Sequence, residues 1–247
     1  MKPCGILLLG AAALGWVLCP ALPAAAWHDE THLAVARAAG YAKWHHAAGA
    51  DMAKLKAGDR EAHNHYVNQP RATPVTPGLV LSQAARYDTV DRDGHLYGAI
   101  VAALRNYAAA RAQGKYGEYH LAFAAHYLGD LSMPLHNLPY DDFNRRNHAA
   151  MDGIVNEEVL ERWREIRVYP VAVASEEDLA REIARVANLA IALGKRLRAQ
   201  DRMPTRQEAY EQLSHSASLL RAVLVWMDAP RGTNEAGGGP PGRSGHP

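Results

Sequence analysis

The chain has 247 residues, and its 27 basic and 26 acidic side chains give a formal net charge of +1 at pH 7. This balance excludes a broadly basic protein that captures nucleic acid or an anionic membrane by charge alone, so any selection of an anionic ligand must be local. The composition includes 13 histidines against two phenylalanines, and so many imidazoles favour a metal-binding protein.

The N-terminus has the pattern of a secretory signal peptide. Lys2 precedes a long apolar run, and three alanines at 24–26 stand directly before Trp27, which is typical of a cleavage site. A membrane anchor would need about 20 apolar residues, and Pro20 and Pro23 interrupt the run. We therefore expect residues 1–26 to be removed, leaving a secreted or periplasmic protein without stable membrane insertion.

This cleavage would determine what holds the mature protein together. Both cysteines, Cys4 and Cys19, lie in the signal peptide, so the mature chain would have no disulfide and would depend on its core or on metal. The length fits a single domain, which we place at residues 27–228. The remainder, 229–247, is rich in glycine and proline and is predicted to be a disordered tail.

Helical patterns follow one another along the domain. Residues 29–48 are rich in alanine with apolar positions at helical spacing, and a second helix is expected over 79–87, after a proline-rich loop. Residues 96–113 predict a long helix. Residues 116–131 predict another, which Pro134 ends.

Two capping patterns mark the start of the last two helices. The stretch SEEDLAREIARVANLAIALGKRLRAQ begins with Ser175, a predicted cap, and Asp178 follows three residues later. Thr205 and Glu208 form a capping box at the start of the final helix. No alternating β pattern of any length is found. The sequence therefore predicts an all-α, single multi-helix domain.

The stretch HYLGDLSMPLHN places three good metal ligands close together. His126 and Asp130 are four residues apart, so a helix carries them on one face. Gly129 has no side chain, so it leaves space beside these two ligands. Pro134 ends the helix, which lets His136 turn back toward the same cavity.

A second pair in NHAAMDGIVNEE, His148 and Asp152, has the same four-residue spacing. Imidazole nitrogen and carboxylate oxygen together form a ligand set that suits zinc, and positions left open for water would make such a site catalytic. The mature chain has no cysteine and no G-x-S-x-G motif, so nothing in it requires a covalent intermediate.

The joint pattern of HYLGD, P-x-H and H-x-x-x-D resembles the zinc-dependent phospholipase C and S1/P1 nuclease superfamily, and the resemblance extends to about Glu158. Members of this superfamily are all-α proteins that hold three zinc ions in one cleft between helices and use an N-terminal tryptophan, through its amine and carbonyl, as a ligand. The resemblance therefore implies three zinc ions and nine ligands: Trp27, His32, Asp51, His65, His126, Asp130, His136, His148 and Asp152.

Two of these assignments have rivals nearby. Asp51 and His65 are 14 residues apart, as in the family, but Asp59 and His63 are alternatives to them. The chain also has Pro139 where the lipase signature usually has asparagine. The other histidines of the domain are interpreted as structural or solvated: His28, His45, His46, His95, His120 and His215.

The resemblance also implies how the ions are shared. Paired ions and an activated water suit phosphodiester hydrolysis, and Asp51 would additionally orient or deprotonate the attacking water as the candidate catalytic residue. Asp130 would bridge two ions. The implied sets are His126 and Asp130 with Asp51 and His65, then Trp27 and His32 with the Asp130 bridge, and finally His136, His148 and Asp152.

Three functions remain open. The first is a phospholipase C-like hydrolase acting on a phospholipid headgroup, which the compact spacing and neutral charge favour. The second is an S1/P1-type nuclease acting on single-stranded nucleic acid, which would need an aromatic platform. Tyr66, Tyr140 and Phe143 are the candidates, although a choline headgroup would use aromatic rings as well. The third is a non-catalytic zinc-binding domain with closed sites.

Overall fold

The protein is described by a computed structural model that covers residues 28–69 and 73–229. The described residues form helices and no strand, which confirms the predicted all-α class. The predicted signal peptide, Trp27 and nearly all of the predicted tail lie outside the described residues. In chain order, the helices are α1 Asp29–Ala38, α2 Gly49–Ala57, α3 Asp59–Ala62, α4 Pro77–Gln83, α5 Leu96–Ala112, α6 Glu118–Leu131, α7 Asp142–Asp152, α8 Asn156–Val159, α9 Glu176–Ala199 and α10 Arg206–Asp228, with short 3-10 helices η1 Trp44–His46, η2 Ala84–Arg86, η3 Pro134–Asn137 and η4 Trp163–Glu165.

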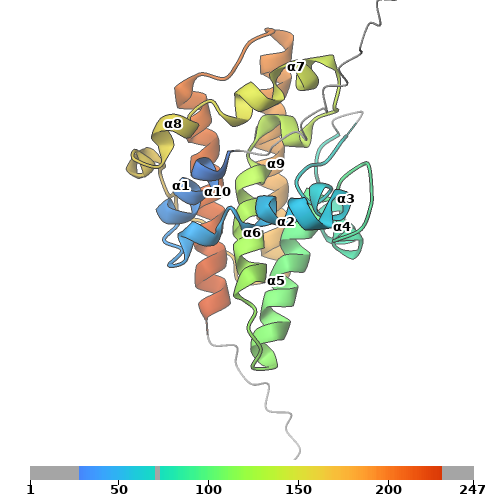
Figure 1. The fold of residues 1–247 in the computed structure, drawn as a ribbon, viewed down its shortest axis with the longest axis vertical. Coiled ribbons are helices and arrows are strands. Elements are labelled where there is room, and N and C mark those ends of the chain that lie inside the picture. Colours follow the sequence, from blue (N-terminus) through green and yellow to red (C-terminus); the bar gives the residue numbers. More distant parts are fainter. Residues whose placement is uncertain (1–27, 70–72, 230–247) are drawn as a thin grey trace, which may run out of the picture.

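Four long helices, α5, α6, α9 and α10, run along the long axis of the molecule and form its body (Figure 1). Helix α6 packs against α5, α9 and α10 in this body and against α1 and α2 outside it. Its second half is therefore buried on all sides, from Ala124 to Leu131. The HYLGD motif thus lies inside the protein, and nearby elements supply its neighbours.

The body is closely packed where α5 meets the end of α4. A Cβ atom at Gly98 would lie 2.1 Å from the carbonyl carbon of Gln83, so only glycine fits at this crossing. Helix α5 buries most of its length, from Leu96 to Leu104. In the part of the chain that the structure covers, no helix is both long enough and apolar enough to cross a membrane.

The predicted caps are confirmed. Ser175 Oγ accepts a hydrogen bond from the backbone N–H of Asp178 at 3.1 Å. Thr205 Oγ1 accepts from the Glu208 N–H at 3.1 Å, and the Glu208 carboxylate accepts from the Thr205 N–H at 2.8 Å, which completes the capping box. The predicted helices over 96–113 and 116–131 are also present, with ends that differ by one or two residues.

The prediction of one continuous helix over 29–48 is wrong. Helix α1 ends at Ala38 because Gly40 takes a left-handed conformation, with φ of +78°, and turns the chain toward η1. The helix expected over 79–87 begins earlier, at Pro77, with Thr76 as its N-cap. Its last residues form the 3-10 helix η2.

Candidate metal centre

Helix α6 supplies the two ligands of the HYLGD motif. His126 and Asp130 are both fully buried, and His126 Nε2 lies 3.4 Å from Asp130 Oδ2. The other ring nitrogen of His126, Nδ1, donates to the carbonyl oxygen of Ala47 at 2.7 Å. This bond places the ring proton on Nδ1 and leaves the Nε2 lone pair facing Asp130, as a metal ligand requires.

Asp130 is surrounded by imidazoles from four parts of the chain. Its Oδ2 lies 2.9 Å from His65 Nδ1 in addition to the contact with His126. Its Oδ1 lies 3.4 Å from His32 Nε2 on α1 and 3.4 Å from His136 Nδ1 on η3. Because its two oxygens face different histidines, Asp130 is placed to be shared between two ions.

Helix α2 adds Asp51 to the buried cluster. Asp51 Oδ1 lies 3.5 Å from His126 Nε2 and 3.8 Å from His65 Nδ1, and it forms an ion pair with Lys54 Nζ at 2.5 Å. The Asp51 side chain is 18% exposed, so Asp51 lies closer to solvent than Asp130 does.

The remaining ligands come from η3 and α7. His148 Nε2 lies 3.3 Å from Asp152 Oδ2, and His136 Nε2 lies 4.0 Å from Asp152 Oδ1. The second nitrogen of His148, Nδ1, donates to Asn144 Oδ1 at 2.6 Å. Asn144 in turn donates to the carbonyl oxygen of Leu135 at 2.9 Å, so α7 and η3 are held together at this point.

These residues form three groups that could each hold a metal ion, with one donor atom per residue and all donors in a group within 4.8 Å of one another. Of the rivals, His63 instead accepts a hydrogen bond from the Asp91 N–H at 2.8 Å, and Asp59 is exposed. The structure therefore brings Asp51 and His65 to the cluster and leaves both rivals outside it. The groups are His32, Asp51 and His126; His65, His126 and Asp130; and His136, His148 and Asp152.

Eight of the nine predicted ligands thus lie together, and the ninth, Trp27, falls outside the described residues. The return of the chain to His136 depends on Asn137, which follows it. Asn137 Nδ2 donates to the carbonyl oxygens of Leu131 at 3.0 Å and Met133 at 2.8 Å, and its Oδ1 accepts from the Tyr97 hydroxyl at 3.0 Å. Asn137 therefore fixes the turn between α6 and η3.

Burial changes the pKa values of these groups in opposite directions. Burial, together with the nearby His126, lowers the pKa of His32 to about 3, and burial lowers the pKa of His148 to about 4. Burial likewise raises the pKa values of Asp130 and Asp152 well above their usual range. The imidazoles are therefore neutral, which is their metal-binding form, while the two buried carboxylates need a cation to remain ionised.

The hydrogen bonding of the cluster supports the same conclusion. Among the described residues, both oxygens of Asp152, Oδ1 of Asp130, both ring nitrogens of His32 and Nδ1 of His136 are buried without a hydrogen-bond partner. Leaving a single buried polar group unpaired costs about 1–3 kcal/mol. Several such atoms that all point into one cluster, each a zinc-type donor, fit a bound metal ion.

Gly129 has the role that its position in the motif predicts. A Cβ atom at this position would lie 2.5 Å from His32 Nδ1. His32 cannot move away easily, because its ring stacks on that of His126 with 3.6 Å between ring centroids. Glycine is therefore required for α1 to bring His32 against α6.

We expect Gly129→Ala to displace His32 and to lower the unfolding free energy of the chelator-treated protein by about 1–3 kcal/mol, as overpacking typically does. Zinc content measured after dialysis should fall as well. Gly78→Ala is the matched control, since a Cβ atom there meets nothing within 4 Å. Equal zinc content and stability in the Gly129→Ala variant would show that α1 and α6 are not packed as described.

A cleft of about 390 Å³ opens onto the cluster. Two aromatic side chains, Tyr66 and Tyr140, and two basic ones, Lys54 and Arg92, line it together with His65, His136 and His148. The prediction that Phe143, the third aromatic candidate, belongs to the site is wrong. It is buried in the hydrophobic core and does not line the cleft.

Sequence reasoning also missed Glu61 on α3. Its carboxylate is buried and lies 3.2 Å from His65 Nε2, on the side of the ring away from Asp130. Burial raises the pKa of Glu61 to about 7, against hydrogen bonds from Tyr127 and Asn64 that lower it. The available signal was its position four residues before His65, the same spacing that identified the other pairs.

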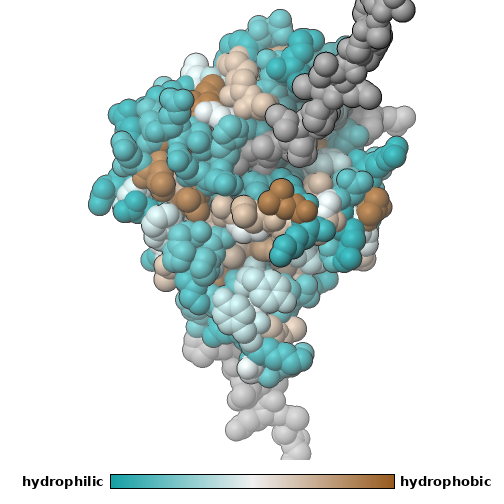
Figure 2. All heavy atoms as spheres, in the orientation of Figure 1, coloured by the Kyte–Doolittle hydropathy of each residue, from teal (hydrophilic) through white to brown (hydrophobic). Residues whose placement is uncertain are grey.

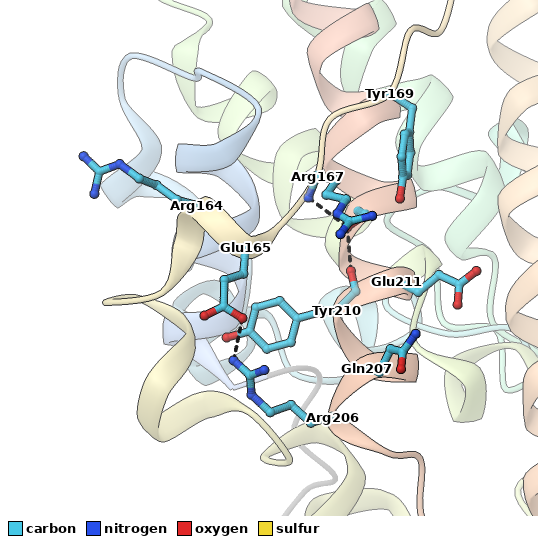
Figure 3. Close-up of a pocket in the computed structure, with 9 residues that line it drawn as sticks. Arg164, Glu165, Arg167, Tyr169, Arg206, Gln207, Tyr210 and Glu211 are labelled. Atoms are coloured by element: carbon cyan, nitrogen blue, oxygen red, sulfur yellow. Dashed lines mark hydrogen bonds and ion pairs between the residues drawn. The ribbon is translucent and has the colours of Figure 1, made fainter.

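A larger groove of about 730 Å³ lies between η4, the segment that follows it and α10 (Figure 3). Its arginines do not converge on a common point. Arg206 pairs with Glu165 at 2.7 Å, and Arg164 points away from Arg206. None of the grouped metal donors lines this groove, so the candidate site is the smaller cleft.

Two comparisons with known proteins were made for this chain. A scan against protein-family models finds no match for the chain, and a search of curated proteins also finds none. The superfamily resemblance therefore depends on the residue pattern, and the geometry of the eight described donors is the independent observation beside it.

Proposed function

We propose that this protein is a secreted zinc-dependent phosphodiester hydrolase of the phospholipase C and P1 nuclease type. The observation that supports this proposal most strongly is the arrangement of three donor groups around Asp130, beneath a cleft with basic side chains. The mixture of imidazole and carboxylate donors suits zinc. When bound, zinc ions supply activation of water near neutral pH and stabilisation of the charge that develops on a phosphodiester.

Two basic residues of the cleft and the nearby Asp51 have complementary tasks. Lys54 and Arg92 place positive charge where a phosphodiester would enter. Burial acts to raise the pKa of Asp51, but nearby His126 and Lys54 outweigh it, so the net shift is downward and the carboxylate is ionised. Asp51 therefore accepts a hydrogen bond from water and orients it toward the substrate, and it is our candidate catalytic residue.

We favour a phospholipid substrate because of the outer face of α2. Met52 is 60% exposed and Leu55 is 80% exposed, while Asp51 and Lys54 of the same helix belong to the site. Hydrophobic atoms are exposed over α2, as they are at several other places on this face (Figure 2). Exposed apolar side chains beside a cleft suit a substrate that is presented at a lipid surface.

A single-strand nuclease of the S1/P1 type is the second candidate. Tyr66 and Tyr140 both line the cleft, and Tyr140 is half exposed, so two rings are available to stack a base. The non-catalytic alternative requires donor groups closed to solvent. It is less favoured because His65, His136 and His148 all line the cleft.

The test uses protein secreted through its own signal peptide, so that any N-terminus at Trp27 is free. Phosphatidylcholine vesicles, soluble short-chain phosphatidylcholine and single-stranded DNA are assayed side by side, with and without a zinc chelator. Chelator-sensitive release of phosphocholine would support the preferred function, and chelator-sensitive release of nucleotides alone would support the nuclease. If the zinc-loaded protein hydrolyses none of the three substrates, both the phospholipase C function and the nuclease function are contradicted.

The N-terminus provides a separate prediction. The backbone N–H of His28, the residue after Trp27, lies 3.5 Å from the carbonyl oxygen of Asp152, so the chain that follows Trp27 reaches the candidate centre. We expect an added methionine or tag before Trp27 to cost one zinc ion and most of the hydrolytic activity. Zinc content is compared between the extended protein and the naturally processed one. Equal zinc content in the two would exclude the amine of Trp27 as a ligand.

A further inference from the structure

Glu61 lies just outside the three donor groups, and three side chains contact its carboxylate. Oε1 lies 3.2 Å from His65 Nε2 and accepts from the Tyr127 hydroxyl at 2.5 Å, and Oε2 accepts from Asn64 Nδ2 at 3.1 Å. The side chain is 5% exposed. A carboxylate held by several protein contacts in the interior has a fixed orientation.

The ring of His65 lies between Glu61 and the metal centre. On one side, Nε2 faces Glu61. On the other side, Nδ1 lies 2.9 Å from Asp130 Oδ2 and 3.2 Å from His126 Nε2. A neutral imidazole has one protonated nitrogen and one lone pair, so the acceptor on one side decides which atom is free on the other.

We propose that Glu61 is a positioning residue that keeps the ring proton of His65 on Nε2 and so directs the Nδ1 lone pair into the metal centre. A carboxylate behind a ligating histidine orients the ring and increases its basicity. This inference rests on the metal-binding part of the proposed function and is independent of the substrate.

The surroundings of Asn64 make the arrangement of Glu61 specific. Asn64 Oδ1 accepts from the Asp88 N–H at 3.2 Å and lies 2.8 Å from His95 Nε2. The amide of Asn64 therefore cannot reverse without losing both contacts, and its Nδ2 must face Glu61. A glutamine at position 61 would have to turn its own NH2 group toward either Asn64 or His65, both of which need an acceptor.

Two other histidine ligands, His126 and His148, also form a hydrogen bond through the ring nitrogen that faces away from the metal centre, and Glu61 differs from their acceptors. His126 donates to the carbonyl oxygen of Ala47, and His148 donates to the amide oxygen of Asn144. Both of those acceptors are neutral. His65 is therefore the ligand among these three whose partner is a carboxyl group, which can form a stronger, charge-assisted hydrogen bond.

The first experiment measures zinc affinity by competition with a chromophoric chelator. We expect Glu61→Gln to weaken binding of one ion by about 10–100-fold, the usual effect of losing such a partner, with no change in the affinity of the group formed by His136, His148 and Asp152. Glu161→Gln, at an exposed position, is the matched control. Wild-type zinc affinity in Glu61→Gln, with a lower melting temperature alone, would reduce Glu61 to a structural role and overturn the proposal.

The second experiment uses the wild-type protein, so it does not depend on whether a variant folds. The ¹⁵N chemical shifts of the His65 ring in the zinc-loaded wild-type protein should identify Nε2 as the protonated nitrogen. A proton on Nδ1 would overturn the proposal. Both readouts are independent of hydrolysis, so a protein that binds zinc through His65 but cleaves no phosphodiester would refute the proposed enzyme and leave the role of Glu61 in place.

Discussion

Replacement of Asp130 by asparagine should remove most of the bound zinc and reduce hydrolysis by more than about 100-fold, since loss of a residue that merely supports a ligand already costs 10–100-fold. The reason is the central position of this carboxylate. Its two oxygens face His65 and His126 on one side and His32 and His136 on the other. Asparagine keeps the shape of the side chain but removes the negative charge that would offset that of the cations.

The Asp130→Asn variant should nevertheless fold. Burial raises the pKa of Asp130 well above its usual range, so the ionised carboxylate is costly without a cation, and a neutral amide relieves that cost. We expect the melting temperature of the chelator-treated protein to be unchanged or higher. Asp59→Asn, at the exposed rival position, should keep wild-type zinc content. Full zinc content in Asp130→Asn would contradict a shared carboxylate at this position.

Replacement of His148 by alanine should abolish hydrolysis while the helical fold is kept. His148 lines the cleft and belongs to the group with His136 and Asp152, two of whose three donors, His136 and His148, line the cleft. Its side chain is only 10% exposed, but it borders the cleft, so we expect its loss to enlarge the cleft while the helices stay packed. The expected loss again exceeds about 100-fold, because His148 is a ligand and not merely the support of one.

The measurements for this variant are hydrolysis of soluble short-chain phosphatidylcholine, zinc content and far-UV circular dichroism. His215→Ala is the matched control, because His215 lies on α10 away from the donor groups. Activity at the wild-type level in His148→Ala would remove His148 from the site. Loss of helical signal together with activity would instead mean that α7 depends on this residue for folding.

The sequence predicts the centre better than it predicts the helices around it. His126 and Asp130 could be paired from sequence because the four-residue period of a helix fixes their relative positions. His148 and Asp152 follow the same rule on α7. By contrast, the end of α1 at Ala38 was missed although the sequence carries a local signal, because Gly40 follows an alanine-rich run and takes the left-handed conformation that commonly ends a helix.

Long-range contacts account for what the sequence missed. Asp51 could not be separated from Asp59 by spacing alone, because the choice depends on how α2 packs against α6. Glu61 was overlooked although it stands four residues before His65, since α3 is only four residues long and has no amphipathic pattern of its own. Phe143 was misplaced because proximity to ligands along the chain does not decide which face of α7 a residue occupies.

The most direct measurement is the zinc content of protein secreted through its own signal peptide, determined by elemental analysis after dialysis against metal-free buffer. The three donor groups predict about three zinc ions per chain, removable by a strong chelator together with all hydrolysis of a phosphodiester. A correctly folded protein that holds no zinc, or that hydrolyses its substrate equally well after the metal is removed, would contradict a zinc-dependent centre around Asp130.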